Sequence, residues 1–287
     1  MKKRLTNLLL VFVFLFGVGL LLYPSFSNYW NSKRATSVIV DYAKQAASLD
    51  TEQYDRMWSQ AEAYNKGLLQ RKNPYLLSDE QRETYEELLD LTGTGVMGYI
   101  EIESLEVSLP IYHGTSDAVL QVAVGHLDWT SMPVGGASTH SVLSGHRGLP
   151  SAKLFTNLDR LEVGDTFVLR ILDEVLTYQV DQIAIVEPDD TRQLLIEDGK
   201  DLCTLVTCTP YGINSHRLLV RGHRIENAEV ARLVRVTSDA VQIEPLLVAP
   251  IVAAPILLVL LIYLFVSDPG TKGGKQHDRK KKQQKTK

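Results

Sequence analysis

Hydrophobic positions along the chain follow three different patterns. Residues 8–22 and residues 246–266 are two apolar runs without a charged side chain. Between them, residues 32–91 have apolar positions at helical spacing, and Ser78-Asp79-Glu80-Gln81 predicts a helix start. From residue 96 to about residue 224, short β-rich runs are separated by turn residues, which is typical of a barrel or sandwich. The expected strands are 97–102, 107–111, 141–144, 166–172, 176–186, 202–208 and 218–220.

Both apolar runs predict attachment to a membrane. Residues 246–266 are long enough to span a bilayer, whereas residues 8–22 are short and fit either a signal-anchor or a cleaved signal peptide. Lys2, Lys3 and Arg4 precede the first run, and eight Lys/Arg side chains follow the second. Because positive charge stays on the cytoplasmic side, we expect both ends inside and the domain between them outside the cell.

These patterns divide the chain into five expected parts. They are a signal or signal-anchor segment at 1–31, a helical extension at 32–95, a β domain at 96–240, a transmembrane helix at 246–266 and a basic cytoplasmic tail at 267–287. The lipid bilayer is therefore an expected partner, through the two terminal segments.

Charge and cysteine content exclude several classes of protein. The net charge is −4, but residues 5–267 alone carry 19 basic and 32 acidic side chains. Such an acidic middle does not fit a nucleic-acid binder, which needs a basic face. The two cysteines are too few for a disulfide scaffold or a Cys-rich zinc site.

Cys203 and Cys208 lie in one expected strand, five residues apart. Their side chains then point to opposite faces, and their Cα atoms lie roughly 16 Å apart, beyond the reach of a disulfide. We therefore expect two free thiols, with Cys203 as a small buried hydrophobe. Cys208 is at the end of the strand, where a scaffold presents reactive groups, and is the candidate nucleophile.

A nucleophilic thiol needs a base and a group that stabilises an oxyanion. His146 directly follows an expected strand and is flanked by glycines, but other histidines remain open alternatives. Arg217 begins the strand after Cys208, so antiparallel pairing puts it opposite that thiol, while Arg221 lies about 13 Å further along. Arg217 is thus a candidate oxyanion donor, with a solvated strand arginine as the alternative. The alternative histidines are His113, His126, His140, His216 and His223.

Two motifs in these segments resemble those of sortases. Thr204-Leu205-Val206-Thr207-Cys208 is followed nine residues later by Arg217, and the histidine motif is Leu143-Ser144-Gly145-His146-Arg147-Gly148-Leu149-Pro150. The similarity runs from about residue 97 to residue 224. The helical extension and the carboxy-terminal membrane helix with its basic tail resemble class C, the pilin-polymerising sortases of Gram-positive bacteria.

This resemblance implies a mainly β fold, an eight-stranded sortase-type barrel with a helical amino-terminal extension and flanking transmembrane helices. It implies Cys208 as nucleophile, His146 as general acid/base and Arg217 as transition-state stabiliser, with no metal and no cofactor. The enzyme would cut an LPXTG-like sorting signal after its threonine and form a thioacyl intermediate. A lysine amine of another pilin subunit would then resolve that intermediate and extend a pilus.

Three alternatives to pilin polymerisation stay open. In the first alternative, a sortase passes surface proteins or pili to a cell-wall peptide, since the catalytic motif does not specify the amine acceptor. A thiol hydrolase would release the cleaved protein to water. A membrane-tethered binding domain without catalysis would make the three site residues a coincidence.

One feature departs from class C. Those enzymes usually carry an amino-terminal lid with an Asp-Pro-aromatic motif, but the only Asp-Pro here is Asp268-Pro269, in the expected tail. The region where a lid should lie contains Asn73-Pro74-Tyr75. Asn73 and Tyr75 are therefore the lid candidates, and a plain turn between two helices is the alternative.

Overall fold

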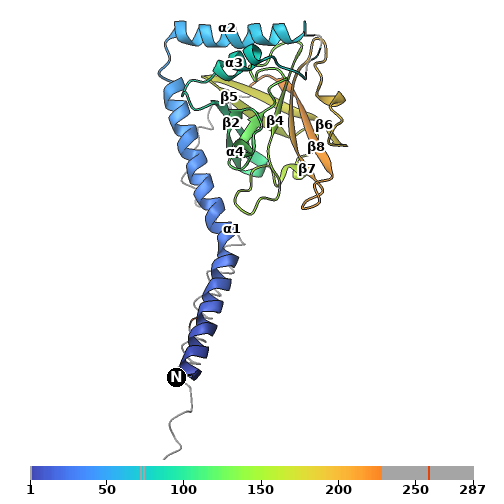
Figure 1. Cartoon of the computed structure of the whole chain (residues 1–287). Helices are drawn as coiled ribbons and strands as arrows, with labels where there is room; N and C mark the ends of the chain where they lie inside the picture. Colours follow the sequence, from blue (N-terminus) through green and yellow to red (C-terminus); the bar gives the residue numbers. More distant parts are fainter. Residues whose placement is uncertain (1, 72, 74, 228–257, 259–287) are drawn as a thin grey trace, which may run out of the picture. The chain divides into compact units, whose positions relative to one another are not determined.

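The fold is an eight-stranded closed barrel with helices before it, as the resemblance implies (Figure 1). This computed structural model describes residues 2–71, 73, 75–227 and 258. Apart from Leu258, the expected membrane helix at 246–266 and the basic tail at 267–287 lie outside the described residues. The chain divides into two compact units, residues 24–240 and residues 1–23 with 241–287.

A single long helix, α1 (Lys2–Ala46), begins the chain. It crosses the expected boundary between residues 31 and 32 without a break and contains Pro24. Proline removes one backbone hydrogen bond, and the helix nevertheless continues through it. From residue 28 onward its inner face contacts the rest of the unit 24–240. Within the described residues, α1 is the one helix apolar and long enough to cross a membrane, a property that signal sequences share.

Tyr42 joins α1 to the barrel through hydrogen bonds. Ala35, Ile39, Tyr42 and Ala46 recur at helical spacing and are all buried. The Tyr42 hydroxyl donates to the Met97 carbonyl at 2.8 Å and accepts from the Leu172 N–H at 2.8 Å. Burial raises the pKa of Tyr42 well above its ordinary value, so this hydroxyl keeps its proton.

Two further helices cover one end of the barrel (Figure 1). Helix α2 (Thr51–Leu68) is capped by Asp50, and helix α3 (Asp79–Glu87) begins with a capping box between Ser78 and Gln81. The predicted helix start at Ser78 is therefore confirmed. Ala61 and Tyr85 from these helices are fully buried in the same core as the barrel interior, so extension and barrel form one folding unit.

The barrel closes in the order β1-β2-β3-β4-β7-β8-β6-β5. All the expected strands are present, most of them longer than predicted, and β3 is an additional short strand. A short helix, α4 (Asp117–Leu120), and three 3₁₀ turns, η1 (Glu103–Leu105), η2 (Leu158–Arg160) and η3 (Arg192–Leu194), lie in the connections. The strands are β1 (Val96–Ile102), β2 (Val107–His113), β3 (Val124–His126), β4 (Thr139–Ser144), β5 (Thr166–Ile171), β6 (Glu174–Val186), β7 (Asp201–Thr209) and β8 (His216–Ile225).

Strands β4, β7 and β8 are covered on both faces. Cys203 and Leu205 of β7 point into the main core of the barrel, while Val206 belongs to a second apolar cluster on the outer face. We call the second group the outer cluster. The β3–β4 loop (127–138) and the β6–β7 loop (187–200) pack against it through Trp129 and Leu194. The outer cluster consists of Val142, Val186, Leu194, Val206 and Leu219.

Candidate active site

Three neighbouring strands bring the predicted site residues to one end of the barrel. Cys208 of β7 is directly opposite Arg217 of β8, so the predicted cross-strand pairing is confirmed. Strand β4 runs parallel to β7 with Ser144 beside Val206, and the Gly145 N–H donates to the Val206 carbonyl at 3.0 Å. Continuing this parallel register by two residues brings His146 level with Cys208. The three residues therefore belong to adjacent strand ends.

The backbone on either side of His146 is held firmly. The Thr207 hydroxyl donates to the Gly145 carbonyl at 2.7 Å, which joins the histidine segment to the strand that carries Cys208. The His146 carbonyl accepts the Phe155 N–H at 3.1 Å. Gly145 lies so close to Phe155 that a Cβ at this position would be 2.7 Å from the ring. Glycine is thus required for the close approach that sets the direction of the chain at His146.

The two cysteines are free and have different surroundings, as expected from the sequence. Cys203 is fully buried, and burial, with a smaller effect of nearby Asp201, raises the pKa of its thiol well above the ordinary value. Cys208 is partly exposed at the end of β7. A buried thiol with a raised pKa is a poor nucleophile, so Cys208 is the reactive candidate.

Arg217 is oriented by the loop between β7 and β8. Its Nη1 donates to the carbonyls of Asn214 and His216 at 3.3 and 3.1 Å. Among the residues that the structure describes, no carboxylate forms an ion pair with this guanidinium. Arginine has five N–H donors, so Nε and Nη2 can donate to an anionic oxygen beside Cys208.

Three of the alternative histidines have structural hydrogen bonds at both ring nitrogens. His126 contacts the Tyr85 hydroxyl at 3.0 Å and the Ser131 carbonyl at 2.8 Å, and complete burial lowers its pKa from 6.5 to about 3. The ring of His113 contacts the carbonyls of Gly95 and Leu88. His140 is described below. These three rings are committed to the fold. His216 contacts the Ser215 hydroxyl and Glu187, and His223 lies 3.9 Å from Asp181. The strand register alone places His146 level with Cys208.

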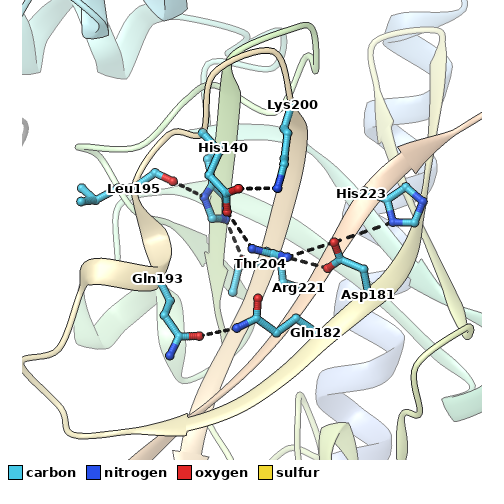
Figure 2. Close-up of polar contacts among 10 residues, drawn as sticks. His140, Asp181, Gln182, Gln193, Leu195, Lys200, Thr204, Arg221 and His223 are labelled. Atoms are coloured by element: carbon cyan, nitrogen blue, oxygen red, sulfur yellow. Dashed lines mark hydrogen bonds and ion pairs between the residues drawn. The ribbon is translucent and has the colours of Figure 1, made fainter.

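A polar network lies on the outer face, four residues along β7 and β8 from Cys208 and Arg217 (Figure 2). His140 contacts the Thr204 hydroxyl at 2.7 Å and the Leu195 carbonyl at 2.8 Å, and burial lowers the pKa of its imidazole. Arg221 binds Asp181 at 2.9 Å and Glu197 at 2.8 Å. Leu195 and Glu197 belong to the β6–β7 loop, so the network holds this loop against the barrel.

One of the lid candidates, Tyr75, touches both loops that cover the outer cluster. The Tyr75 ring packs edge-on against Trp129 of the β3–β4 loop, with ring centroids 5.0 Å apart. Its hydroxyl accepts from the Thr191 hydroxyl of the β6–β7 loop at 3.1 Å. The Asn73 side chain accepts the Tyr75 N–H at 3.0 Å and so shapes the local turn. The connection between α2 and α3 therefore contacts both loops through one aromatic side chain.

Helix α2 also holds the β3–β4 loop, a role that no sequence motif indicated. The buried Asn65 amide donates to the Met132 carbonyl at 3.1 Å and accepts the Met132 N–H at 2.7 Å. The Tyr64 hydroxyl donates to the Asp128 carbonyl at 3.0 Å. An asparagine among the apolar positions of a predicted helix is the one sequence signal that could have drawn attention to this contact.

In the described part of the chain, no group of three His, Cys, Asp or Glu side chains could hold a metal ion.

Comparison with known proteins agrees with the fold described above. Residues 100–225 match the Sortase domain. The crystal structure of sortase C1 from Streptococcus agalactiae is 50% identical, with a TM-score of 0.65 over 67% of this chain and 100% of that one. The chain belongs to the sortase family. Sortase C of Streptococcus pneumoniae is also similar, with 44% identity and a TM-score of 0.61 over 67% of this chain and 97% of that one.

These structural relatives identify the chain as a class C sortase. Among curated relatives, sortase D of Bacillus subtilis (strain 168) is 31% identical over 131 residues. That match covers 45% of this sortase and 63% of the Bacillus protein, slightly less than two thirds of its length.

Proposed function

We propose that this sortase is a cysteine transpeptidase that acts on an LPXTG-like sorting signal. The observation that carries the proposal is the pairing of Cys208 with Arg217 on adjacent strands, with His146 at the end of the next strand. A thiol, a proton-transfer group and an oxyanion donor are the three elements that acyl transfer requires. The outer cluster and its two covering loops lie immediately along the strands from these residues.

In the first half-reaction, the Cys208 sulfur attacks the carbonyl carbon of the signal's threonine. Arg217 donates hydrogen bonds to the oxygen, which becomes negatively charged, while the carbonyls of Asn214 and His216 hold one end of its guanidinium. The Thr–Gly bond then breaks, and His146 gives its proton to the departing glycine amine. The product is a thioester between Cys208 and the threonine.

In the second half-reaction, an amine attacks the thioester. His146 takes a proton from this amine, the carbon–sulfur bond breaks, and Cys208 is released for the next cycle. We propose that the amine is a lysine side chain of another pilin subunit, so that each cycle adds one subunit to a pilus. Support comes from the class C relatives, among which the S. pneumoniae structure is described as giving insight into pilin substrate specificity.

We propose further that the apolar part of α1 anchors the enzyme in the membrane and that the barrel lies outside the cell. Support comes from the apolar character of α1 and from Lys2, Lys3 and Arg4 at its beginning. The basic residues at the other end of the sequence favour the same orientation.

The lid candidates belong to the same proposal. Tyr75 and Asn73 form a lid in which the aromatic ring bridges the β3–β4 and β6–β7 loops. Because Asn73 is neutral and bonds within its own turn, this lid lacks the carboxylate of an Asp-Pro-aromatic motif. We therefore expect it to hold the site closed less tightly than an acidic lid that can pair with an arginine.

The proposed reaction can be tested with full-length protein in detergent micelles and an LPXTG-bearing pilin subunit. We expect a ladder of covalent pilin multimers by gel and intact mass, and no ladder with Cys208→Ala. Arg217→Lys should lower turnover about 100-fold, because an oxyanion donor contributes on that order. Arg221→Lys on the same strand is the matched control and should retain turnover within about tenfold.

Other products would identify the alternatives. Cleaved monomer in the presence of a lysine-bearing acceptor would indicate a hydrolase, and an adduct with added oligoglycine would indicate transfer to a wall peptide. If a thiol-reactive LPXTG analogue formed no adduct on Cys208, the proposal of covalent catalysis would be wrong.

A further inference from the structure

Helix α1 contacts the loop that follows His146. The Asn28 side-chain oxygen accepts the Lys153 N–H at 2.9 Å, and the Asn31 amide nitrogen donates to the Ser151 carbonyl at 2.9 Å. The partners are 125 and 120 residues apart in sequence. Two side chains one turn apart on the helix therefore hold the backbone of one short segment, residues 151–153.

The same loop is firmly connected to His146. Phe155 is buried, and its N–H donates to the His146 carbonyl at 3.1 Å. The Gly148 N–H donates to the Thr156 hydroxyl at 3.1 Å, which closes the loop on itself. A shift of residues 151–153 is thus transmitted to the backbone of His146 through Phe155, because packed segments move together.

The sequence of α1 fits this contact. Asn28 and Asn31 are half-buried on the inner face, which continues with the buried residues Ala35 and Ile39. The inner face carries amide side chains where it meets the backbone of the loop, and Ala35 and Ile39 are buried further along it. Trp30, on the opposite side, is exposed.

We propose that Asn28 and Asn31 are positioning residues that hold the loop 147–157, and through it His146, in the geometry for proton transfer. The proposal rests on the role proposed above for His146. Proton transfer requires the imidazole within hydrogen-bond reach of the departing amine, and small displacements lower the rate steeply. The helix that carries the apolar anchor thus also supports the catalytic site.

The two asparagines have opposite hydrogen-bonding roles, which makes a sharp test possible. Asn28 is an acceptor, so Asn28→Asp keeps its bond to the Lys153 N–H, whereas Asn28→Ala removes it. Asn31 is a donor, so Asn31→Asp replaces a favourable contact with a carboxylate facing the Ser151 carbonyl. Ser32→Asp places the same charge on the exposed side of the same helix and is the control.

The experiment uses full-length protein in micelles, with hydrogen exchange of residues 147–157 and kinetics of signal cleavage. In Asn31→Asp and Asn28→Ala we expect amide exchange of Lys153 and Phe155 to rise about tenfold, as for the loss of one net hydrogen bond. The kcat should fall about tenfold at an unchanged KM. Asn28→Asp and Ser32→Asp should remain within about twofold of the wild type in both measurements.

Wild-type exchange and kcat in Asn31→Asp and Asn28→Ala would overturn the proposal, and so would an equal loss in Ser32→Asp. The outcome is separable from that of the proposed function. If the wild-type protein does not cleave the signal but Asn31→Asp still raises the exchange, the two asparagines hold the loop and the proposed reaction is wrong. If the wild type cleaves the signal and the variants change neither the exchange nor kcat, only the positioning role of the asparagines is wrong.

Discussion

The direction of the chain at His146 depends on the absence of a side chain at the preceding residue. Gly145 is linked to β7 at both its N–H and its carbonyl, and it faces the Phe155 ring. A methyl group cannot be added there unless Phe155 moves, and the Phe155 backbone is bonded to His146. The size of one residue therefore controls the position of the proposed acid and base.

We predict that Gly145→Ala lowers kcat/KM for signal cleavage by about 10- to 100-fold, because the histidine is displaced while the barrel stays folded. Gly67→Ala in α2 is the matched control, since a Cβ there meets no atom within 4 Å. Steady-state kinetics with circular dichroism of each variant provides the measurement. Equal activity of the two variants would show that the Phe155 contact does not control His146.

At this scale the sequence predicts the pair Cys208 and Arg217 better than it predicts the histidine. Two strands joined by a short loop have a register that can be counted, and the counted register is the observed one. The position of His146 depends on parallel pairing between β4 and β7, which are separated in sequence by two strands and two 3₁₀ turns. No local pattern specifies such a pairing, so the histidine was distinguished from its alternatives only by a resemblance.

Among the elements, the connection between α2 and α3 carries the residues that we propose as a lid. Its aromatic residue touches a loop on either side of the outer cluster, and α2 holds one of these loops through Asn65. The connection thus joins the helical extension to the walls of the site. Tyr75 makes these contacts through the packing of its ring on Trp129 and one hydrogen bond between its hydroxyl and that of Thr191. Both interactions are of modest strength.

We predict that Tyr75→Ala raises the rate of Cys208 alkylation by a bulky thiol reagent about three- to tenfold, because the bridge between the loops is lost. Leu76→Ala is the control, since this neighbour is 70% exposed. The rate is measured by intact mass under pseudo-first-order conditions. An unchanged rate in Tyr75→Ala would argue against a lid at this position.

The elements themselves were largely predictable, with two informative exceptions. Alternation of apolar residues indicates the longer strands, but β3 has only three residues, all buried, and therefore no alternation. Helix α1 passes Pro24 and the expected boundary without a break, although a proline inside a helical pattern is a local signal for a helix end. Contacts such as that between Tyr75 and Thr191 join distant segments and have no local signature.

At the scale of the whole catalytic unit, helices and barrel are joined through buried polar groups. Tyr85 of α3 contacts His126 of β3, and both side chains are almost completely buried. Such a contact is stable only while the imidazole is neutral, because a buried charge without a partner is costly. The stability of the unit is therefore coupled to pH.

We predict that the free energy of unfolding decreases as the pH falls from about 6.5 towards 4. The pKa of His126 is about 3 in the folded chain and 6.5 in the unfolded chain, so only the unfolded chain binds this proton in that interval. One such group contributes roughly 1.4 kcal/mol per pH unit. The lowered pKa of His140 acts in the same direction.

Urea titrations followed by tryptophan fluorescence at pH 7, 6 and 5 measure this dependence. In His126→Gln the free energy of unfolding should depend less steeply on pH, by the amount that corresponds to the uptake of about one proton on unfolding. This difference in slope is expected whatever the overall stability of the variant. The same slope in both proteins would mean that His126 does not remain neutral in the folded state.

The separation of the two thiols has a consequence for survival in an oxidising environment. Cys203 is enclosed in the core at the far end of β7, so it cannot act as a resolving partner if peroxide converts Cys208 to a sulfenic acid. Without an internal disulfide as a protected state, further oxidation to the sulfinic acid is irreversible. If Cys208 is the nucleophile that we propose, the enzyme depends on small thiols from its surroundings, or on occupancy of Cys208 by its substrate, to preserve this sulfur.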